Sequence, residues 1–231
     1  MAKAVRADPT AEPRVRLSRE RVLRAAVELA DESGIESLTM RTLGQKLGVE
    51  AMSLYNHVAN KEDILDGMVE VVMNEVNDAV SEIDVPAREW KTAMRRRVLA
   101  ARQIFLRHPW APGVLESRTK TSTPMLRYND SVIGLFLEAG FSPDLTHHAM
   151  HALGSRALGF TQELGDDSDV DLEQTKTFIR QVAGEFPNIA AMLEEVTHDA
   201  DTTLGWCDDQ FEFEFALDLL LDGLERLRDG A

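Results

Sequence analysis

Three adjacent side chains, Tyr55, Asn56 and His57, combine hydrogen-bonding groups that suit contact with double-stranded DNA. An asparagine amide can read the edge of a base in the major groove, whereas tyrosine and histidine can bond phosphate oxygens. Helix N-termini also attract phosphate, and Lys61 stands where a long helix is expected to begin. These residue types at this spacing indicate a nucleic-acid contact.

Two short helices and a glycine turn are expected to position these side chains. Thr39 can cap a helix that stops at Gly48, where glycine permits the positive φ of a tight turn. A second helix, at about residues 52–58, then follows. A small apolar core is expected to hold the two helices together: Leu43, Leu47, Val49, Leu54 and Val58. A helical subdomain that binds no ligand is the open alternative, since short patterns of this kind also arise by chance.

The charge distribution separates the front of the chain from the remainder. The whole chain carries a net charge of −15, which by itself disfavours binding to nucleic acid. Residues 1–62, however, hold 10 Lys and Arg against 9 Asp and Glu, whereas the remainder holds 15 against 31. An acidic body would confine DNA contact to the front end, where five arginines cluster: Arg14, Arg16, Arg19, Arg21 and Arg24. The charge distribution alone is equally consistent with an ordinary acidic protein that does not bind DNA.

Almost every segment after residue 17 has the apolar periodicity of a helix, so the sequence predicts an all-α fold. Residues 1–17 are polar, contain two prolines and are expected to form a flexible basic arm. Ser18 and Asn60 are expected to cap helices that end near residues 33 and 83. Pro86 suits the first position of a helix that ends before Pro109. Further helices are expected at 111–117, 124–139, 143–164, 172–183, 187–197 and 208–228.

Several classes of protein are disfavoured. No run of about 18 apolar residues could span a membrane, and the first residues lack the apolar stretch of a secretory signal. The single cysteine, Cys207, cannot form an internal disulfide or pair with a resolving thiol, so a cytoplasmic protein is expected. No catalytic constellation, phosphate-binding glycine loop or Ca²⁺ loop is recognisable, and we expect neither an enzyme nor a cofactor. His147 and His151 share a helix face and could chelate a transition metal, but no third ligand is identifiable.

The helix order that ends Leu54-Tyr55-Asn56-His57-Val58 and continues Asn60-Lys61-Glu62 resembles the TetR family of bacterial regulators, nearest the tetracycline-repressor branch. The resemblance is close over residues 18–66 and looser at 135–142 and 213–227. It implies about ten helices, with a helix-turn-helix domain at 18–62 and an effector-binding and dimerisation domain at 63–231. It also implies DNA contacts at Thr39, Arg41, Ala51, Met52, Ser53, Tyr55, Asn56, His57 and Lys61. Ala51 and Met52 can touch a thymine methyl group but cannot form side-chain hydrogen bonds.

The resemblance further implies a small-molecule site in the helical body. A stripe at helical spacing is by itself more typical of a core, but the family places a pocket there. The implied lining is Met94, Val98, Ala101, Phe105, Trp110, Val114, Tyr128, Val132 and Ser155. Val114 and Ser155 stand where the tetracycline-repressor branch carries metal-binding histidines. We therefore expect an apolar or aromatic effector and no magnesium–tetracycline chelate.

The last helix is apolar on most of its sides, so most of its sides must be buried. Together with the helix at 143–164 it is expected to form a four-helix bundle with a second copy of the chain. The candidate interface residues are Phe211, Phe215, Leu219 and Leu220. The alternative is that this helix is the centre of a monomeric core.

The sequence thus predicts a homodimeric regulator, by family default a repressor, which binds a palindromic operator and is released by a small effector. The first alternative is a small-molecule- or metal-binding helical protein with a vestigial DNA-binding head, supported only by the Ala51-Met52 pair. A helical enzyme is a third possibility, for which the sequence offers no catalytic set.

Overall fold

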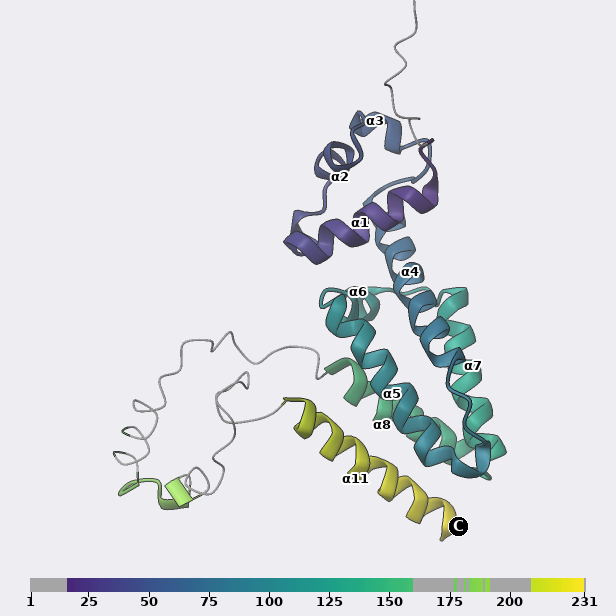
Figure 1. The fold of residues 1–231 in the computed structure, drawn as a ribbon, viewed down its shortest axis with the longest axis vertical. Helices are drawn as coiled ribbons and strands as arrows, with labels where there is room; N and C mark the ends of the chain where they lie inside the picture. Colours follow the sequence, from purple (N-terminus) through teal and green to yellow (C-terminus); the bar gives the residue numbers. More distant parts are fainter. Residues whose placement is uncertain are drawn as a thin grey trace, which may run out of the picture. The chain divides into compact units, whose positions relative to one another are not determined.

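The computed structural model describes residues 16–159 and 209–230, together with isolated positions between 177 and 191. In this part of the chain there are nine α-helices, two 3₁₀ turns and no strand, which confirms the all-α prediction (Figure 1). The predicted helices at 172–183 and 187–197 lie largely outside the described residues. The basic arm up to residue 15 and Cys207 lie wholly outside them.

The chain divides into two units, Met1–Val71 and Val72–Ala231. This division falls within α4 (Lys61–Ser81), whereas the sequence placed the domain boundary after residue 62. None of the described helices is long and apolar enough to cross a membrane.

The N-terminal unit contains α1 (Arg19–Ser33), the 3₁₀ turn η1 (Ile35–Ser37), α2 (Met40–Leu47), α3 (Ala51–Leu54) and the first part of α4. The predicted caps are present. The Ser18 Oγ accepts a hydrogen bond from the backbone N–H of Arg21 at 3.2 Å, and the Asn60 Oδ1 accepts from that of Asp63 at 2.9 Å. A Cβ on Gly67 would lie 2.5 Å from Leu23, so glycine permits the close approach of α4 to α1.

The C-terminal unit contains the rest of α4, the 3₁₀ turn η2 (Ala87–Glu89), α5 (Trp90–Arg107), α6 (Ala111–Ser117), α7 (Thr123–Glu138), α8 (Pro143–Gly159) and α11 (Asp209–Asp229). Two predicted helix starts differ from the structure, one by four residues and one by a single residue. Pro86 precedes η2, and the α-helix begins only at Trp90. The cap of α7 is Ser122, whose Oγ accepts from the Met125 N–H at 3.4 Å, so Thr123 is already helical.

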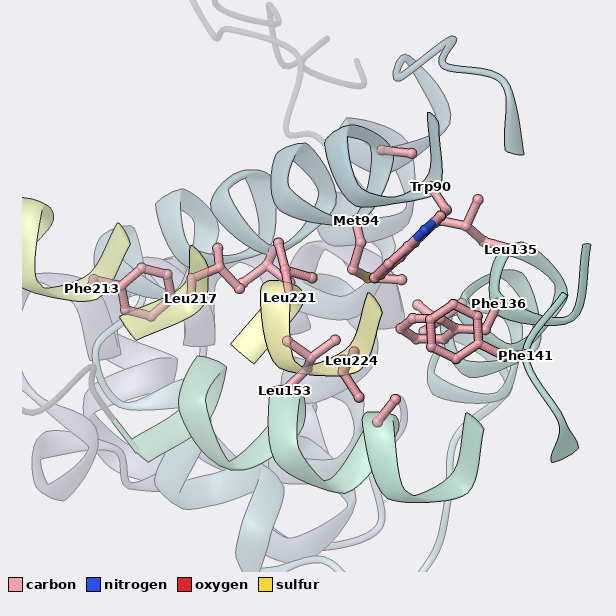
Figure 2. Packing of buried hydrophobic residues seen from close by; sticks show 14 residues of the cluster. Trp90, Met94, Leu135, Phe136, Phe141, Leu153, Phe213, Leu217, Leu221 and Leu224 are labelled. Atoms are coloured by element: carbon pink, nitrogen blue, oxygen red, sulfur yellow. The ribbon is translucent and has the colours of Figure 1, made fainter. Parts of the chain in front are cut away.

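One apolar core joins α5, α7, α8 and α11 (Figure 2). The Trp90 and Phe136 rings meet Phe141, each with centroids 4.8 Å apart. From α11, a stripe at helical spacing enters the same core: Phe213, Leu217, Leu221 and Leu224. Figure 1 shows α11 lying beside α5 and α8.

Ion pairs between α5 and α11 run along the edge of this core. Lys91 pairs with Asp222 and, at 3.2 Å, with Glu225. One and three turns after Lys91 along α5, Arg95 pairs with Asp218 at 2.7 Å, and the Arg102 Nε donates to the Gln210 side chain at 3.2 Å. The spacing of the cations on α5 therefore matches that of the acceptors on α11.

Candidate DNA-contact surface and effector cavity

The start of α2 is fixed by a reciprocal pair of threonines. The Thr39 Oγ1 accepts from the backbone N–H of Thr42 at 3.1 Å, and the Thr42 Oγ1 accepts from that of Thr39 at 3.0 Å. This capping box leaves Thr39 exposed at the helix N-terminus, next to the exposed Arg41. At the other end, Gly48 has φ 66°, the left-handed conformation expected for the turn.

The second helix of the motif is shorter than predicted. The segment was expected to be helical over residues 52–58, but α3 ends at Leu54. Tyr55, Asn56 and His57 form a turn in which the His57 N–H donates to the Leu54 carbonyl three residues back, at 2.8 Å. The buried side chains of Leu54 and Val58 anchor this turn on both sides. The three polar residues therefore project from a tight turn after α3.

Most of the predicted DNA-contacting side chains are exposed on the N-terminal unit. Met52 is 75% exposed and Tyr55 47%, unusually high values for large apolar or aromatic groups. The remaining members are exposed or half-buried: Thr39, Arg41, Asn56 and Lys61 are exposed, and Ala51, Ser53 and His57 are half-buried. This surface, comprising the nine residues predicted to contact DNA, is called the α2–α3 face below.

Ion pairs within the N-terminal unit determine which of its cationic side chains remain available to bind DNA. The Arg19 guanidinium binds both carboxylate oxygens of Asp63, at 2.8 and 2.9 Å, and this contact holds the pKa of Asp63 below its usual range. Arg24 pairs with Glu20 at 2.7 Å, and Lys46 with Glu32 at 2.9 Å.

Arg19 and Arg24 of the arginine cluster at the front are therefore engaged within the unit. Arg41 and Lys61, in contrast, make no ion pair with any residue that the structure describes.

The C-terminal unit contains an apolar cavity of about 130 Å³. Side chains from α4, α5, α6, α7 and α8 surround it. The lining residues are Met73, Val76, Met94, Val98, Ala101, Phe105, Leu115, Met125, Tyr128, Asn129, Val132, Met150, Leu153, Gly154, Ala157 and Leu158. Burial raises the pKa of Tyr128, so its hydroxyl stays protonated at neutral pH.

Six of the nine residues implied as pocket lining border this cavity: Met94, Val98, Ala101, Phe105, Tyr128 and Val132. Trp110 and Val114 are buried elsewhere in the unit, and Ser155 is exposed. The α4 residues Met73 and Val76 also border the cavity, although the sequence did not predict this. Their apolar spacing was visible, but the same spacing is found in any buried helix.

The candidate interface residues lie on the side of α11 opposite its buried stripe. Phe211, Phe215 and Leu219 are 56%, 54% and 55% exposed, and the two phenylalanine rings stack with centroids 6.4 Å apart. Leu220 instead packs partly against the core. In the part of the chain that the structure describes, Phe211, Phe215 and Leu219 stay more than half exposed, and these three residues are called the α11 stripe below.

The histidines of α8 are exposed, and the His147 and His151 rings lie 4.6 Å apart. In the described part of the chain, no three His, Cys, Asp or Glu side chains are arranged to hold a metal ion.

Comparisons with known proteins agree with this architecture. The model for bacterial regulatory proteins of the tetR family matches residues 22–68, and that for the tetracyclin repressor-like C-terminal domain matches residues 84–228. The class D tetracycline repressor protein of Escherichia coli is 28% identical over 210 residues, which cover 91% of this chain and 90% of that protein.

Two further relatives are somewhat more identical to this chain, at 31% and 32%. A crystal structure of a possible TetR family transcriptional regulator from Streptomyces coelicolor A3(2) has a TM-score of 0.72 and 31% identity, covering 91% of this chain and all of that one. An HTH-type transcriptional regulator of Saccharopolyspora erythraea is 32% identical over 125 residues, and the match spans only 51% of that relative and 54% of this chain. The chain therefore belongs to the tetR family of bacterial regulatory proteins, which are DNA-binding transcription factors and not enzymes.

Proposed function

We propose that this chain is a repressor that binds a palindromic operator as a homodimer and releases it when a small apolar or aromatic effector occupies the cavity. The observation that carries the proposal is the α2–α3 face. On this face the large side chains of Met52 and Tyr55 and the amide of Asn56 are exposed. Such exposure adds nothing to the stability of a single chain, so it indicates a binding surface. Because operators are chromosomal DNA, we assign the protein to the cytoplasm.

The two classes of side chain on this face would contribute differently to DNA binding. Arg41 and Lys61 are available to phosphates, which supply affinity without reading sequence. Tyr55 and Asn56 can form hydrogen bonds to phosphates and base edges, whereas Met52 offers only an apolar contact, suited to a thymine methyl group. We therefore expect an operator that differs from the tetracycline operator where Ala51 and Met52 make contact.

A band-shift assay with DNA from upstream of the chain's own gene tests operator binding. We expect a specific complex at moderate salt that Tyr55→Ala weakens by about 10- to 100-fold. Arg41→Ala should weaken binding to all DNA sequences by a similar factor. It should also lower the slope of log K for DNA binding against the log of the salt concentration by about 1.

Leu137→Ala is the matched control, because Leu137 has a similar exposure, 44%, but lies on α7 of the other unit. Binding that is sequence-blind, or equally affected by Tyr55→Ala and Leu137→Ala, would refute operator recognition. With ligand binding retained, that result would favour a vestigial DNA-binding head.

The homodimer is proposed from the α11 stripe. Three large apolar side chains spaced by four residues, Phe211, Phe215 and Leu219, remain exposed in the single chain. A second copy of the same stripe would cover them, as required for the self-complementary interface of a two-fold dimer. A dimer would also present two helix-turn-helix domains to the two half-sites of a palindromic operator.

Sedimentation velocity tests this interface. Phe215→Glu places a charge in the stripe and should convert the protein to monomers, with operator binding lost at the same concentration. Leu126→Glu is the control, since Leu126 is 57% exposed on α7 and outside the stripe. A Phe215→Glu protein that still sediments as a dimer would exclude the stripe as the interface.

The link from effector to DNA is proposed to run through α4. Met73 and Val76 from its second half line the cavity, and the Asn77 amide donates to the Met73 and Pro124 carbonyls, each at 2.9 Å. The second of these bonds ties α4 to the first turn of α7. An effector that shifts α7 would bias α4, and this would change the relative populations of dimers that fit the operator and dimers that do not.

A further inference from the structure

The polar groups of the cavity are confined to one helix. Of the sixteen lining residues that the structure describes, fourteen have apolar side chains or none, and the two polar ones, Tyr128 and Asn129, are neighbours on α7. The described lining from α4, α5, α6 and α8 is apolar. Among these residues, a ligand in the cavity therefore meets hydrogen-bonding groups from α7 alone.

The polar groups of Tyr128 and Asn129 have unused bonding capacity. With the residues that the structure describes, neither the Tyr128 hydroxyl nor the Asn129 amide forms a hydrogen bond. Asn77 shows the contrast, because both N–H groups of its amide are engaged by backbone carbonyls. Both side chains are half-buried and border the cavity, so a ligand that offers them a hydrogen-bonding atom is favoured over one that does not.

The surrounding charge selects the kind of ligand atom. The positive charge of Arg97 acts on Tyr128, and the buried Arg97 Nε has no hydrogen-bond partner among the described residues. A cationic nitrogen would be repelled there, whereas an oxygen with partial negative charge would be attracted. The neutral Tyr128 hydroxyl can donate to such an oxygen, and the Asn129 amide can donate or accept.

The size and lining of the cavity limit the rest of the ligand. An engineered protein cavity of about 150 Å³ is large enough for benzene, so the present volume suits a single ring. Four of the lining residues are methionines, whose flexible thioethers make favourable contacts with aromatic rings: Met73, Met94, Met125 and Met150.

We infer that the cavity selects an aromatic ring bearing one hydrogen-bonding oxygen, and that Tyr128 and Asn129 are the residues that recognise this oxygen. The inference rests on the proposed effector role of the cavity and specifies its ligand class. Such a ligand places its ring among the methionines and its hydroxyl or carbonyl oxygen against α7. Tyr128 and Asn129 thus determine specificity, while the apolar lining supplies most of the affinity.

Calorimetric titration with phenol and toluene tests this selection, because the two probes have similar shapes and differ by a hydroxyl in place of a methyl group. The measured quantity is the ratio of the toluene Kd to the phenol Kd, which cancels changes in the apolar lining when variants are compared. We expect this ratio to fall by about tenfold in Tyr128→Phe or Asn129→Leu relative to the unmodified protein. Met125→Leu, a volume-conserving change in the lining, should leave the ratio unaltered.

The outcomes separate this inference from the proposal on which it rests. Urea unfolding first confirms that each variant is folded. If both probes bind and the ratio is the same in all proteins, the oxygen-selecting role of Tyr128 and Asn129 is refuted, while an aromatic effector stands. If neither probe binds the unmodified protein, the aromatic effector is refuted as well. A ratio that falls in either α7 variant but not in Met125→Leu supports the inference.

Discussion

The two ends of the C-terminal unit are both apolar, but one is filled and the other is hollow. At the filled end, three rings from α5, α7 and the segment after α7, Trp90, Phe136 and Phe141, pack with centroids 4.8–5.8 Å apart. At the hollow end, later turns of α5 and earlier turns of α7 border the cavity. The same helices therefore pack closely at one end and border a cavity at the other.

The difference lies in the side chains and not in the backbone. Rigid rings fill space completely, whereas the hollow end is lined by flexible methionines and by the small residues Ala101, Gly154 and Ala157. A ligand-responsive protein needs this division. The filled end keeps the unit folded when the hollow end is empty, and it resists deformation when the hollow end is occupied.

Removing a ring from the filled end should have the largest effect. Phe136→Ala takes away a fully buried ring whose neighbours cannot collapse into the space, and it should lower the free energy of unfolding by about 3–5 kcal/mol. Met125→Ala at the hollow end should cost less, because Met125 is only half-buried and already borders empty space. Urea denaturation measures both. Equal losses would contradict the distinction between the two ends.

Much of this arrangement is predictable from the sequence where the signal is local. The caps Ser18, Thr39 and Asn60 act within three residues of themselves, and their side chains therefore identified three helix starts. The same reason applies to the lining residues on α5, which share one helix face: Met94, Val98, Ala101 and Phe105.

The sequence could not distinguish a cavity from a core. Val114 and Met73 both appear as buried apolar positions, and only the assembled unit shows that Met73 borders the cavity while Val114 does not. The end of α3 was also missed. Asn56 bonds three residues back instead of four, which the apolar spacing of Leu54 and Val58 does not reveal.

Adding a methyl group to the hollow end should affect stability and binding in opposite directions. Gly154 lies on α8, borders the cavity, and has no atom within 4 Å of where a Cβ would be. Gly154→Ala should therefore stabilise the helix by about 1 kcal/mol and reduce the space for a ligand. We expect a higher Tm and weaker phenol binding.

Gly134 provides the matched control for this variant. It lies within α7 and also has open space at its Cβ position, but it does not border the cavity. Gly134→Ala should raise the Tm by a similar amount without weakening phenol binding. If Gly134→Ala weakens binding as much as Gly154→Ala does, the effect comes from helix rigidity and not from lost cavity space.

The ion pairs beside the filled end should make a small, pH-dependent contribution. The hydrogen bond from Lys91 holds the pKa of Asp222 below its usual value. A lowered folded-state pKa contributes stability above the unfolded pKa, about 3.9, and this contribution is lost as pH falls through the folded value. Lys91→Met should return the Asp222 pKa toward its usual value, as measured by NMR titration. Acid unfolding of this variant should then depend less steeply on pH. An Asp222 pKa that Lys91→Met leaves unchanged would show that the pair is not formed in solution.

The smallest effect is expected from Tyr128, at the hollow end, in alkaline solution. The chain has two tyrosines, so Tyr55→Phe leaves Tyr128 as the only one to titrate. Because burial raises the Tyr128 pKa, its ultraviolet titration should lie above the ordinary value of about 10 while the protein is folded. A raised folded pKa contributes stability below the unfolded pKa, and this contribution is lost as pH rises through the folded value. Toluene, which does not itself titrate, should displace the titration further upward when it occupies the cavity, because the bound ring excludes water from the hydroxyl. A Tyr128 titration at the ordinary value would mean that water reaches the Tyr128 hydroxyl freely, and the contrast between the filled end and an apolar hollow end would then fail.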